Sequence, residues 1–279
     1  MILVGKKSVR SFYTLPVSTL RLTGNKAQIP FDRTLPIIRG IILILISLIL
    51  PLSSYSQGEF NNWYFGEHAG ITFNNGAPIA LTNCATSFSN QFATCSISDS
   101  LGNLLFYSDG FRVYNRNHTI MPNGHFINGQ DFSQHQAVFC VPSLQDTNLF
   151  FLFTIDWYFT NLYPNPLGLR YSIIDMQLNG GLGDIQAGQK NIPIPSAWDA
   201  CYNVSGTRHQ NNKFAWVVTR KYHNSSYYAS YLVSNSGLDT TAVLSNSLIP
   251  LNIDPTDTTL SDYSEIIKIS PDGKKLIST

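Results

Sequence analysis

Charged residues are scarce in this chain of 279 residues. They make up 13% of the sequence, about half the share that is usual for soluble domains. Aromatic residues also contribute 13%, and apolar residues as a whole 43%, so the chain can build a sizeable core. Intrinsic disorder needs many charges and few aromatic side chains, so this composition argues against a disordered chain. It also argues against a long charged coiled coil.

The chain has almost no net charge, but the charges are unevenly distributed. The total is +1. Residues 1–56 contain seven basic and one acidic residue, a balance of +6, whereas the remainder contains 11 basic and 16 acidic residues, a balance of −5. The acidic balance and the absence of a basic stripe with interleaved aromatics argue against a nucleic-acid partner.

The sequence also lacks an apolar run of the roughly 20 residues that a membrane helix needs. The longest such run follows Arg39 and ends at Leu50, and the small residues Ser54 and Ser56 come shortly after it. A basic flank, a short apolar run and a small-x-small exit are typical of a secretory signal peptide. A buried core helix or a membrane anchor is the alternative interpretation.

We therefore expect residues 1–56 to be an N-terminal extension with a signal peptide, and residues 57–279 to be the exported domain. Cleavage after Ser56 would leave Gln57 as the mature N-terminus and no stable membrane span, which predicts a secreted or cell-surface protein. The stretch 1–36 is long for the basic region of a signal peptide, so a translation start further downstream is an alternative to Met1.

Four cysteines occur, and none has the C-x-x-C spacing of a zinc ribbon. Export makes them candidates for disulfides instead. Cys84 and Cys95 are the candidate pair, because they close a short loop whose cross-link contributes about 3 kcal/mol on the chain-entropy model. The alternative is that both are free buried thiols.

Helical periodicity is absent after Gln57, where short β-rich runs alternate with Gly, Asn, Asp and Ser clusters. The pattern predicts an opening pair of strands and then meanders of three, of which the last is incomplete. The expected strands are 62–66, 71–73, 93–98, 104–108, 111–115, 136–141, 149–155, 169–174, 200–204, 213–219, 227–233, 264–269 and 274–277. Asp109-Gly110 and Ser270-Pro-Asp-Gly273 are predicted turns.

Repeated meanders favour an all-β fold, a β-propeller of four-stranded antiparallel blades (WD40-like or TolB-like), over a β-sandwich, which would also give short strands and frequent turns. The central strands are 47 to 65 residues apart, a range that fits blades with variable insertions. Propellers contain 4–8 blades and must close on themselves. We therefore expect 57–279 to be an incomplete propeller domain, apparently truncated at its C-terminus.

Several motifs of residues 57–279 resemble one family of exported proteins. They include Asn62-Trp-Tyr-Phe-Gly66, Gly102-Asn-Leu-Leu-Phe-Tyr-Ser-Asp-Gly110, Asn115-Arg-Asn-His118, Asp175-Met-Gln-Leu-Asn-Gly-Gly-Leu-Gly-Asp184 and Ser270-Pro-Asp-Gly-Lys274. Together they resemble the N-terminal propeller region of exported Bacteroidetes gliding-motility-associated, PKD-domain-containing proteins, which are substrates of type IX secretion. The resemblance implies further domains in the same polypeptide, among them PKD and sorting domains, and brings no catalytic residues with it.

Patterns that carry chemistry are missing. The six histidines show neither His-x-His nor His-x-x-x-His spacing, and no calcium loop or nucleophile elbow occurs. Gly180-Gly-Leu-Gly183 lacks the third glycine of a dinucleotide loop and is read as a hairpin turn. Asp99 and Asp109 are expected to bind their own backbone in turns, and His118 is expected to be a turn residue with one hydrogen bond. The sequence thus predicts no catalytic residue, metal or cofactor.

One aromatic segment is a candidate ligand-stacking loop. Trp157, Tyr158 and Phe159 follow an expected strand, and Tyr163 lies in the Pro-rich stretch after them. An aromatic loop of this kind stacks on sugars or anchors a protein partner. The alternative is that these side chains fold over the side of the domain.

The sequence favours a non-enzymatic, exported binding or adhesion module with a glycan or a surface protein as partner. We expect this module to be the N-terminal part of a larger multidomain surface protein. The alternative is a polysaccharide-active enzyme, a glycosidase or lyase on a propeller scaffold, whose paired carboxylates would lie about 5–9.5 Å apart. A purely architectural spacer without a ligand is a third interpretation.

Overall fold

The structure is a computed structural model of the chain, and it describes residues 58–86, 93–129, 136–155, 168–209, 213–221, 227–246, 266–270 and 273–278. The chain divides into two compact units, Met1–Ser54 and Tyr55–Thr279, and every described residue belongs to the second. The expected signal peptide and extension at residues 1–56 lie outside the described residues.

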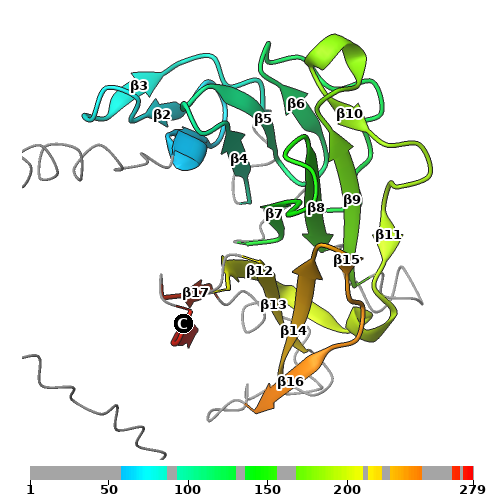
Figure 1. Ribbon diagram of the computed structural model, residues 1–279. Coiled ribbons are helices and arrows are strands. Elements are labelled where there is room, and N and C mark those ends of the chain that lie inside the picture. The colour runs from blue at the N-terminus through cyan, green and yellow to red at the C-terminus, as the bar shows by residue number, and fades with distance from the viewer. Residues whose placement is uncertain are drawn as a thin grey trace, which may run out of the picture. The chain divides into compact units, whose positions relative to one another are not determined.

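The second unit is all-β, as expected, and consists of five small antiparallel sheets (Figure 1). Among the described residues, helix is confined to three short 3-10 turns, Gly58–Phe60, Asn179–Gly181 and Pro195–Ala197. No helix in this part of the chain is long and apolar enough to cross a membrane.

Each sheet is a run of strands that follow one another in the sequence. Sheet I contains β1 (Asn62–Tyr64), β2 (Gly70–Thr72) and β3 (Ile79–Leu81), and sheet II contains β4 (Cys95–Ser98), β5 (Leu104–Ser108) and β6 (Val113–Asn115). Sheet V contains β17 (Ile267–Ile269) and β18 (Leu276–Ser278).

Sheets III and IV each have three long strands, and two short strands together take the place of a fourth strand at one edge. Sheet III contains β7 (Val138–Pro142), β8 (Leu149–Ile155) and β9 (Leu169–Asp175), and both β10 (Asp184–Ile185) and β11 (Ile192–Pro193) pair with β9. Sheet IV contains β12 (Ala200–Arg208), β13 (Ala215–Lys221) and β14 (Tyr227–Ser234), and both β15 (Gly237–Leu238) and β16 (Val243–Asn246) pair with β14.

The first strands of the sheets lie beside one another in the order of the sequence. β1 packs beside β4, β4 beside β7, β7 beside β12, and β12 beside β17. The later strands of each sheet continue away from this row, because each pairs with an earlier strand of its own sheet. The five sheets therefore follow one another in the order of the sequence, and buried side chains fill the space between neighbouring sheets.

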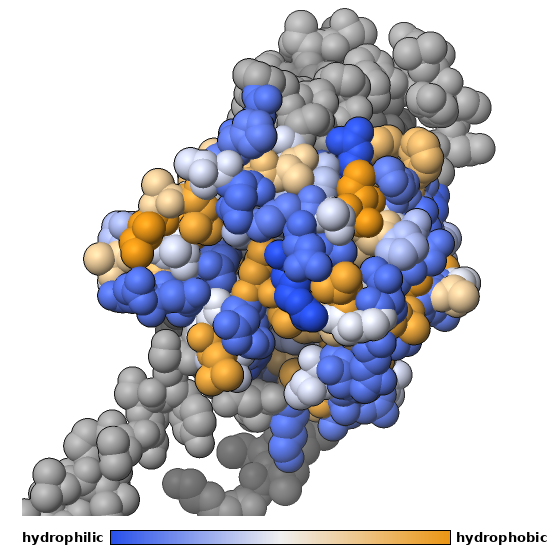
Figure 2. Space-filling model, turned by 90° about the horizontal axis from the view of Figure 1, so that it is seen from above, coloured by the Kyte–Doolittle hydropathy of each residue, from blue (hydrophilic) through white to orange (hydrophobic). Residues whose placement is uncertain are grey.

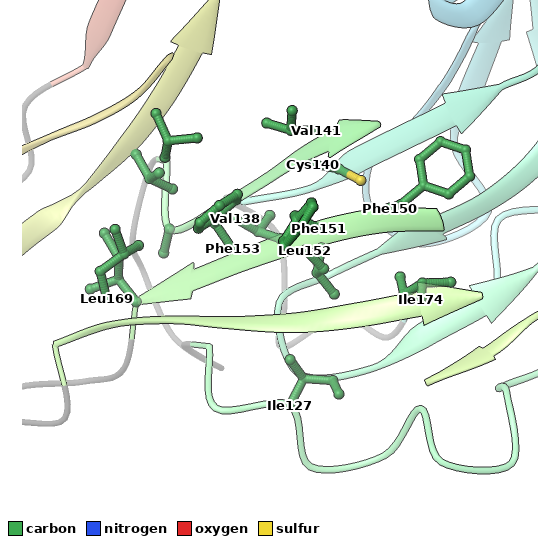
Figure 3. Close-up of a cluster of buried hydrophobic side chains, with 14 of the residues drawn as sticks. Ile127, Val138, Cys140, Val141, Phe150, Phe151, Leu152, Phe153, Leu169 and Ile174 are labelled. Carbon is green, nitrogen blue, oxygen red and sulfur yellow. The ribbon is translucent and has the colours of Figure 1, made fainter. Parts of the chain in front are cut away.

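The core follows from this order. One cluster of buried side chains extends from sheet II through sheet III to sheet IV, and two smaller clusters lie between sheets I and II and between sheets IV and V. Residues on the two faces of a strand alternate, so Phe106 of β5 enters the large cluster and its neighbour Tyr107 enters the cluster with sheet I. Figure 3 shows part of the large cluster around β7 and β8.

The expected turns are present. Gly110, two residues after β5, has φ 83°, and the amide of Gly273, with φ 68°, donates to the carbonyl of Ser270 between β17 and β18. The segment Gly180–Gly183 connects β9 to the antiparallel β10, and the carbonyl of Leu178 accepts the amides of Gly181 and Gly183. This segment is a hairpin turn, as its sequence indicated.

Gln136 joins three sheets at one end of the row of first strands. Its backbone forms a parallel bridge with Asn203 of β12, and its carbonyl accepts the amide of Val204 at 2.9 Å. Its side-chain amide hydrogen-bonds both backbone groups of Ile267, donating to the carbonyl at 2.9 Å and accepting from the amide at 2.8 Å. The Gln136 side chain thus takes the place of a neighbouring strand for β17.

We expect Gln136→Ala to loosen sheet V, because both backbone groups of Ile267 lose their partner. Two hydrogen bonds of this kind contribute roughly 1–3 kcal/mol together. Hydrogen exchange should accelerate in residues 266–278 and stay unchanged in sheet III. Gln145→Ala, which removes an exposed glutamine after β7, is the control and should leave exchange unaltered. Unchanged protection of Ile267 in Gln136→Ala would contradict this role.

Candidate functional site

Three tyrosines form a stack between sheets I and II. The rings of Tyr64 and Tyr107 are 4.7 Å apart at an interplanar angle of 15°, and those of Tyr107 and Tyr114 are 5.0 Å apart at 9°. All three side chains are buried. The imidazole of His118 lies against this stack, with its centroid 5.4 Å from Tyr64 and 5.8 Å from Tyr107. We call these four residues the tyrosine–histidine cluster.

A tight turn presents His118 to the tyrosines. The side-chain carbonyl of Asn115 accepts the Asn117 amide at 2.9 Å and the Thr119 hydroxyl at 3.1 Å, and the amide of His118 donates to the Asn115 carbonyl. His118 has φ 60°, a conformation that few residues other than glycine adopt. The sequence was therefore right to place His118 in a turn.

Hydrogen bonds close the edges of the cluster. The Tyr107 hydroxyl accepts the Ala85 amide at 3.0 Å and lies 3.3 Å from His118 Nδ1. Nε2 of His118 lies 2.7 Å from Asn83 Nδ2. The expectation of a single hydrogen bond at His118 was too low, because its second partner comes from the loop after β3, far away in the sequence.

Burial keeps the cluster uncharged near neutral pH. Burial raises the pKa of Tyr64 and Tyr107, and it raises the pKa of Tyr114 to about 12, with the nearby Asp109 carboxylate as a further cause. Burial also lowers the pKa of His118, because the charged imidazolium would lose solvation. The rings stack on one another and share hydrogen bonds, so the cluster acts as a packing element between two sheets.

A second aromatic group lies on the opposite face of sheet I. Trp63 is 51% exposed, and Phe65 and Phe60 are also exposed. The ring of Phe73 contacts that of Trp63 edge-on at 5.2 Å. The indole N–H of Trp63 donates to the carbonyl of Phe60 at 2.8 Å, which fixes the ring at the surface. We call Phe60, Trp63, Phe65 and Phe73 the aromatic row.

The aromatic row is exposed because sheet I contacts a neighbouring sheet on one face alone within the described residues. The buried Tyr64 points toward sheet II, and the residues before and after it in the sequence point away. Figure 2 shows apolar side chains reaching a largely polar surface in one view of the molecule. The sequence pattern marked Asn62–Gly66 as a strand and did not single out Trp63, although three aromatics in a row were the available signal.

The aromatic loop predicted to bind a ligand, with Trp157, Tyr158, Phe159 and Tyr163, lies outside the described residues. Its role stays a prediction.

The acidic residues in the described turns have structural partners. Asp99 Oδ1 accepts the amides of Leu101 and Asn103. Burial is the largest single influence on the pKa of Asp99 and raises it, but the hydrogen bonds to its carboxylate together outweigh burial and lower the pKa. Asp109 Oδ1 accepts the amides of Phe111 and Arg112. Both acids therefore bind their own turns, as expected. Asp184 instead bonds the backbone and side chain of Asn123, at 2.8 and 2.7 Å, and so joins sheets II and III.

None of the four cysteines is in a disulfide in the structure. Cys84 packs in the cluster between sheets I and II, with its Sγ 3.2 Å from the hydroxyl of Thr86. Cys95 packs against the large cluster on the other side of sheet II. The predicted disulfide between Cys84 and Cys95 is not formed, because a sheet stands between the two thiols and a disulfide needs Cβ atoms about 4 Å apart.

No metal site is found in the part of the chain that the structure describes, where no three His, Cys, Asp or Glu side chains are grouped to hold an ion. Comparison with known proteins found no matching family model, no matching curated protein and no matching solved structure. Function is therefore inferred from the geometry of the chain itself.

We expect the half-buried, neutral state of His118 to make the fold sensitive to mild acid. The lowered pKa means that the unfolded chain takes up a proton below about pH 6.5 while folded His118 stays neutral. Stability from this group is therefore present above pH 6.5 and is lost as the pH falls through the lowered folded-state pKa. Denaturant unfolding between pH 7.5 and 5.5 should show this loss.

The variant His118→Asn should flatten that pH dependence, since asparagine also tolerates positive φ. His68→Asn is the matched control, because His68 has φ 52° but is exposed. The control should keep the wild-type slope. An identical slope in His118→Asn and wild type would show that His118 is not the responsible group.

Proposed function

We propose that this chain is the β-propeller part of an exported cell-surface or secreted protein and that it acts as a non-enzymatic binding or adhesion module. In this proposal the chain is the N-terminal part of a larger multidomain surface protein. The observation that carries the proposal is the serial order of the sheets. First strands lie side by side in sequence order, and every later strand continues away from them.

This order supports blades rather than a sandwich. In a β-sandwich, two sheets share one core between their inner faces. Here five sheets succeed one another, and sheets II, III and IV each contact a neighbour on both faces. The parallel bridge between Gln136 and Asn203 supports first strands that run in a common direction, as radially repeated blades require.

The aromatic row supports binding. Exposed clusters of large apolar side chains are uncommon on soluble proteins and mark interaction surfaces. Trp63 presents a ring whose polar N–H already has a partner in Phe60, so the ring face is free for an apolar contact. We propose a surface polysaccharide as the ligand, with a sugar ring stacked on Trp63.

No observation favours the glycosidase or lyase alternative. Catalytic carboxylates need freedom to reach a substrate and a pair of matched environments. Asp99, Asp109 and Asp184 instead accept hydrogen bonds from the adjacent backbone or from Asn123. The described residues therefore support the binding interpretation over the glycosidase or lyase interpretation.

We expect Trp63→Ala to weaken binding to a polysaccharide array by about 30-fold, the equivalent of roughly 2 kcal/mol for a central aromatic anchor. Trp198→Ala is the matched control, because Trp198 is 47% exposed and precedes sheet IV. The control should bind like wild type. Binding is measured by calorimetry, folding by thermal melting, and release of reducing sugar by a colorimetric assay.

Each outcome of that experiment decides between interpretations. Sugar release by the wild type would overturn the non-enzymatic proposal. Capture of a surface protein instead of a glycan would replace the ligand class and keep the binding role. A large loss of thermal stability in Trp63→Ala, without any ligand for the wild type, would show that the aromatic row packs inside the protein and would end the proposal of a ligand surface.

Export is tested separately. We expect the full-length chain, expressed in a bacterium with a Sec pathway, to leave the cytoplasm with Gln57 as its new N-terminus. N-terminal sequencing of the exported fraction measures this. Arg39→Glu, which removes the positive charge before the apolar run, should reduce export, and Arg10→Glu is the control. An unprocessed protein that stays in the cytoplasm would contradict the proposed location.

A further inference from the structure

Cys95 and Cys140 occupy the first strands of neighbouring sheets. Cys95 begins β4 of sheet II, and Cys140 is the central residue of β7 in sheet III. These two strands pack beside each other, and both cysteine side chains contribute to the same hydrophobic cluster. They are about 45 residues apart in the sequence, so the fold brings them into one layer.

The two side chains point into the same interface. On β4, Ser96 and Ser98 bind Tyr64 and Asn62 of sheet I, so the alternate residue Cys95 faces sheet III. On β7, the ring of Phe139 lies over Gly206 of sheet IV, where an added Cβ would come within 2.5 Å of its Cε1. Cys140, the next residue, therefore faces sheet II.

The two cysteines also lie at matching heights. Phe106 contacts Phe150 edge-on at 5.2 Å across the interface between sheets II and III. Phe106 pairs with Ile97, two residues after Cys95. Phe150 pairs with Pro142, two residues after Cys140. On β4 and on β7, the cysteine therefore lies two residues before the residue that pairs with a phenylalanine of this contact. Figure 3 shows Cys140 on β7 within this cluster.

The electrostatics of the thiols agree with this placement. Burial raises the pKa of Cys95 to about 12. Burial also raises the pKa of Cys140, and the neighbouring Cys95 raises it further. Buried thiols with raised pKa react slowly, because the thiolate is the reactive form.

We propose that Cys95 and Cys140 form a disulfide that joins sheets II and III in the oxidised protein. The S–S bond forms as the two S–H bonds break, and the two electrons and two protons reduce one molecule of a disulfide oxidant, such as oxidised glutathione, to two thiols. The bond forms before the sheets close over the sulfurs, since the folded interface excludes the oxidant. Cys84 and Cys201 remain thiols.

The test uses the chain from Gln57 onward, purified and refolded with a mixture of oxidised and reduced glutathione, and also the full chain. Free thiols are alkylated under denaturing conditions, and proteolytic peptides are identified by mass with and without reductant. We expect two alkylated cysteines, Cys84 and Cys201, and one reductant-sensitive peptide pair that contains Cys95 and Cys140. Because the oxidant is supplied in vitro, this result does not depend on export or on any ligand.

Variants supply the controls. Cys84→Ser and Cys201→Ser should retain the cross-linked peptides, and Cys95→Ser or Cys140→Ser should abolish them. Closing a loop of this length should raise the melting temperature of the oxidised wild type by roughly 10 °C over the reduced protein. That difference should disappear in Cys95→Ser. Four alkylated cysteines in the refolded wild type, or a peptide pair that links Cys84 to Cys95, would overturn the proposal.

Discussion

The face-to-face packing of successive sheets is the constraint on which the rest of the structure depends. Sheets built of strands of two to nine residues are too small to be stable alone in water. Each sheet becomes stable because neighbouring sheets cover its faces, and contacts between successive first strands connect all five sheets. The buried cluster that runs through sheets II, III and IV is the result, so a change at Leu152 or Phe106 would affect more than one sheet.

The two faces of sheet I show how one strand serves two purposes. Tyr64 enters the stack with Tyr107, where geometry contributes about 0.5–1.5 kcal/mol per aromatic pair beyond the burial of area. Trp63, the preceding residue, stands at the surface in the aromatic row. Alternation along the strand therefore separates a packing surface from a surface available for contacts. The tyrosine–histidine cluster is fully engaged and uncharged, which is why the binding role is assigned to the other face.

Local pattern predicted the strands well where packing and pattern agree. The expected ranges 104–108 and 149–155 coincide with β5 and β8, whose apolar residues are continuous because both faces are covered. The sequence missed β3, β10, β11, β15 and β16. All five are pieces of two to four residues, too short to show a strand pattern. β10, β11, β15 and β16 form because a longer strand, β9 or β14, offers free backbone groups beside them. At the candidate site, the turn at His118 was predictable, whereas its partner Asn83 depends on how two sheets meet.

The cysteines show the limit of reasoning from distance along the chain. Loop-closure entropy favours a cross-link between near neighbours in an unfolded chain, which made Cys84 and Cys95 the natural pair in the sequence. In the folded protein, the face of the strand on which each thiol lies decides instead. Sheet II separates Cys84 from Cys95, while the alternation of β4 and β7 turns Cys95 and Cys140 toward one interface. A repeating series of sheets makes such contacts between corresponding strands a regular outcome, because each first strand meets the next one at a similar height.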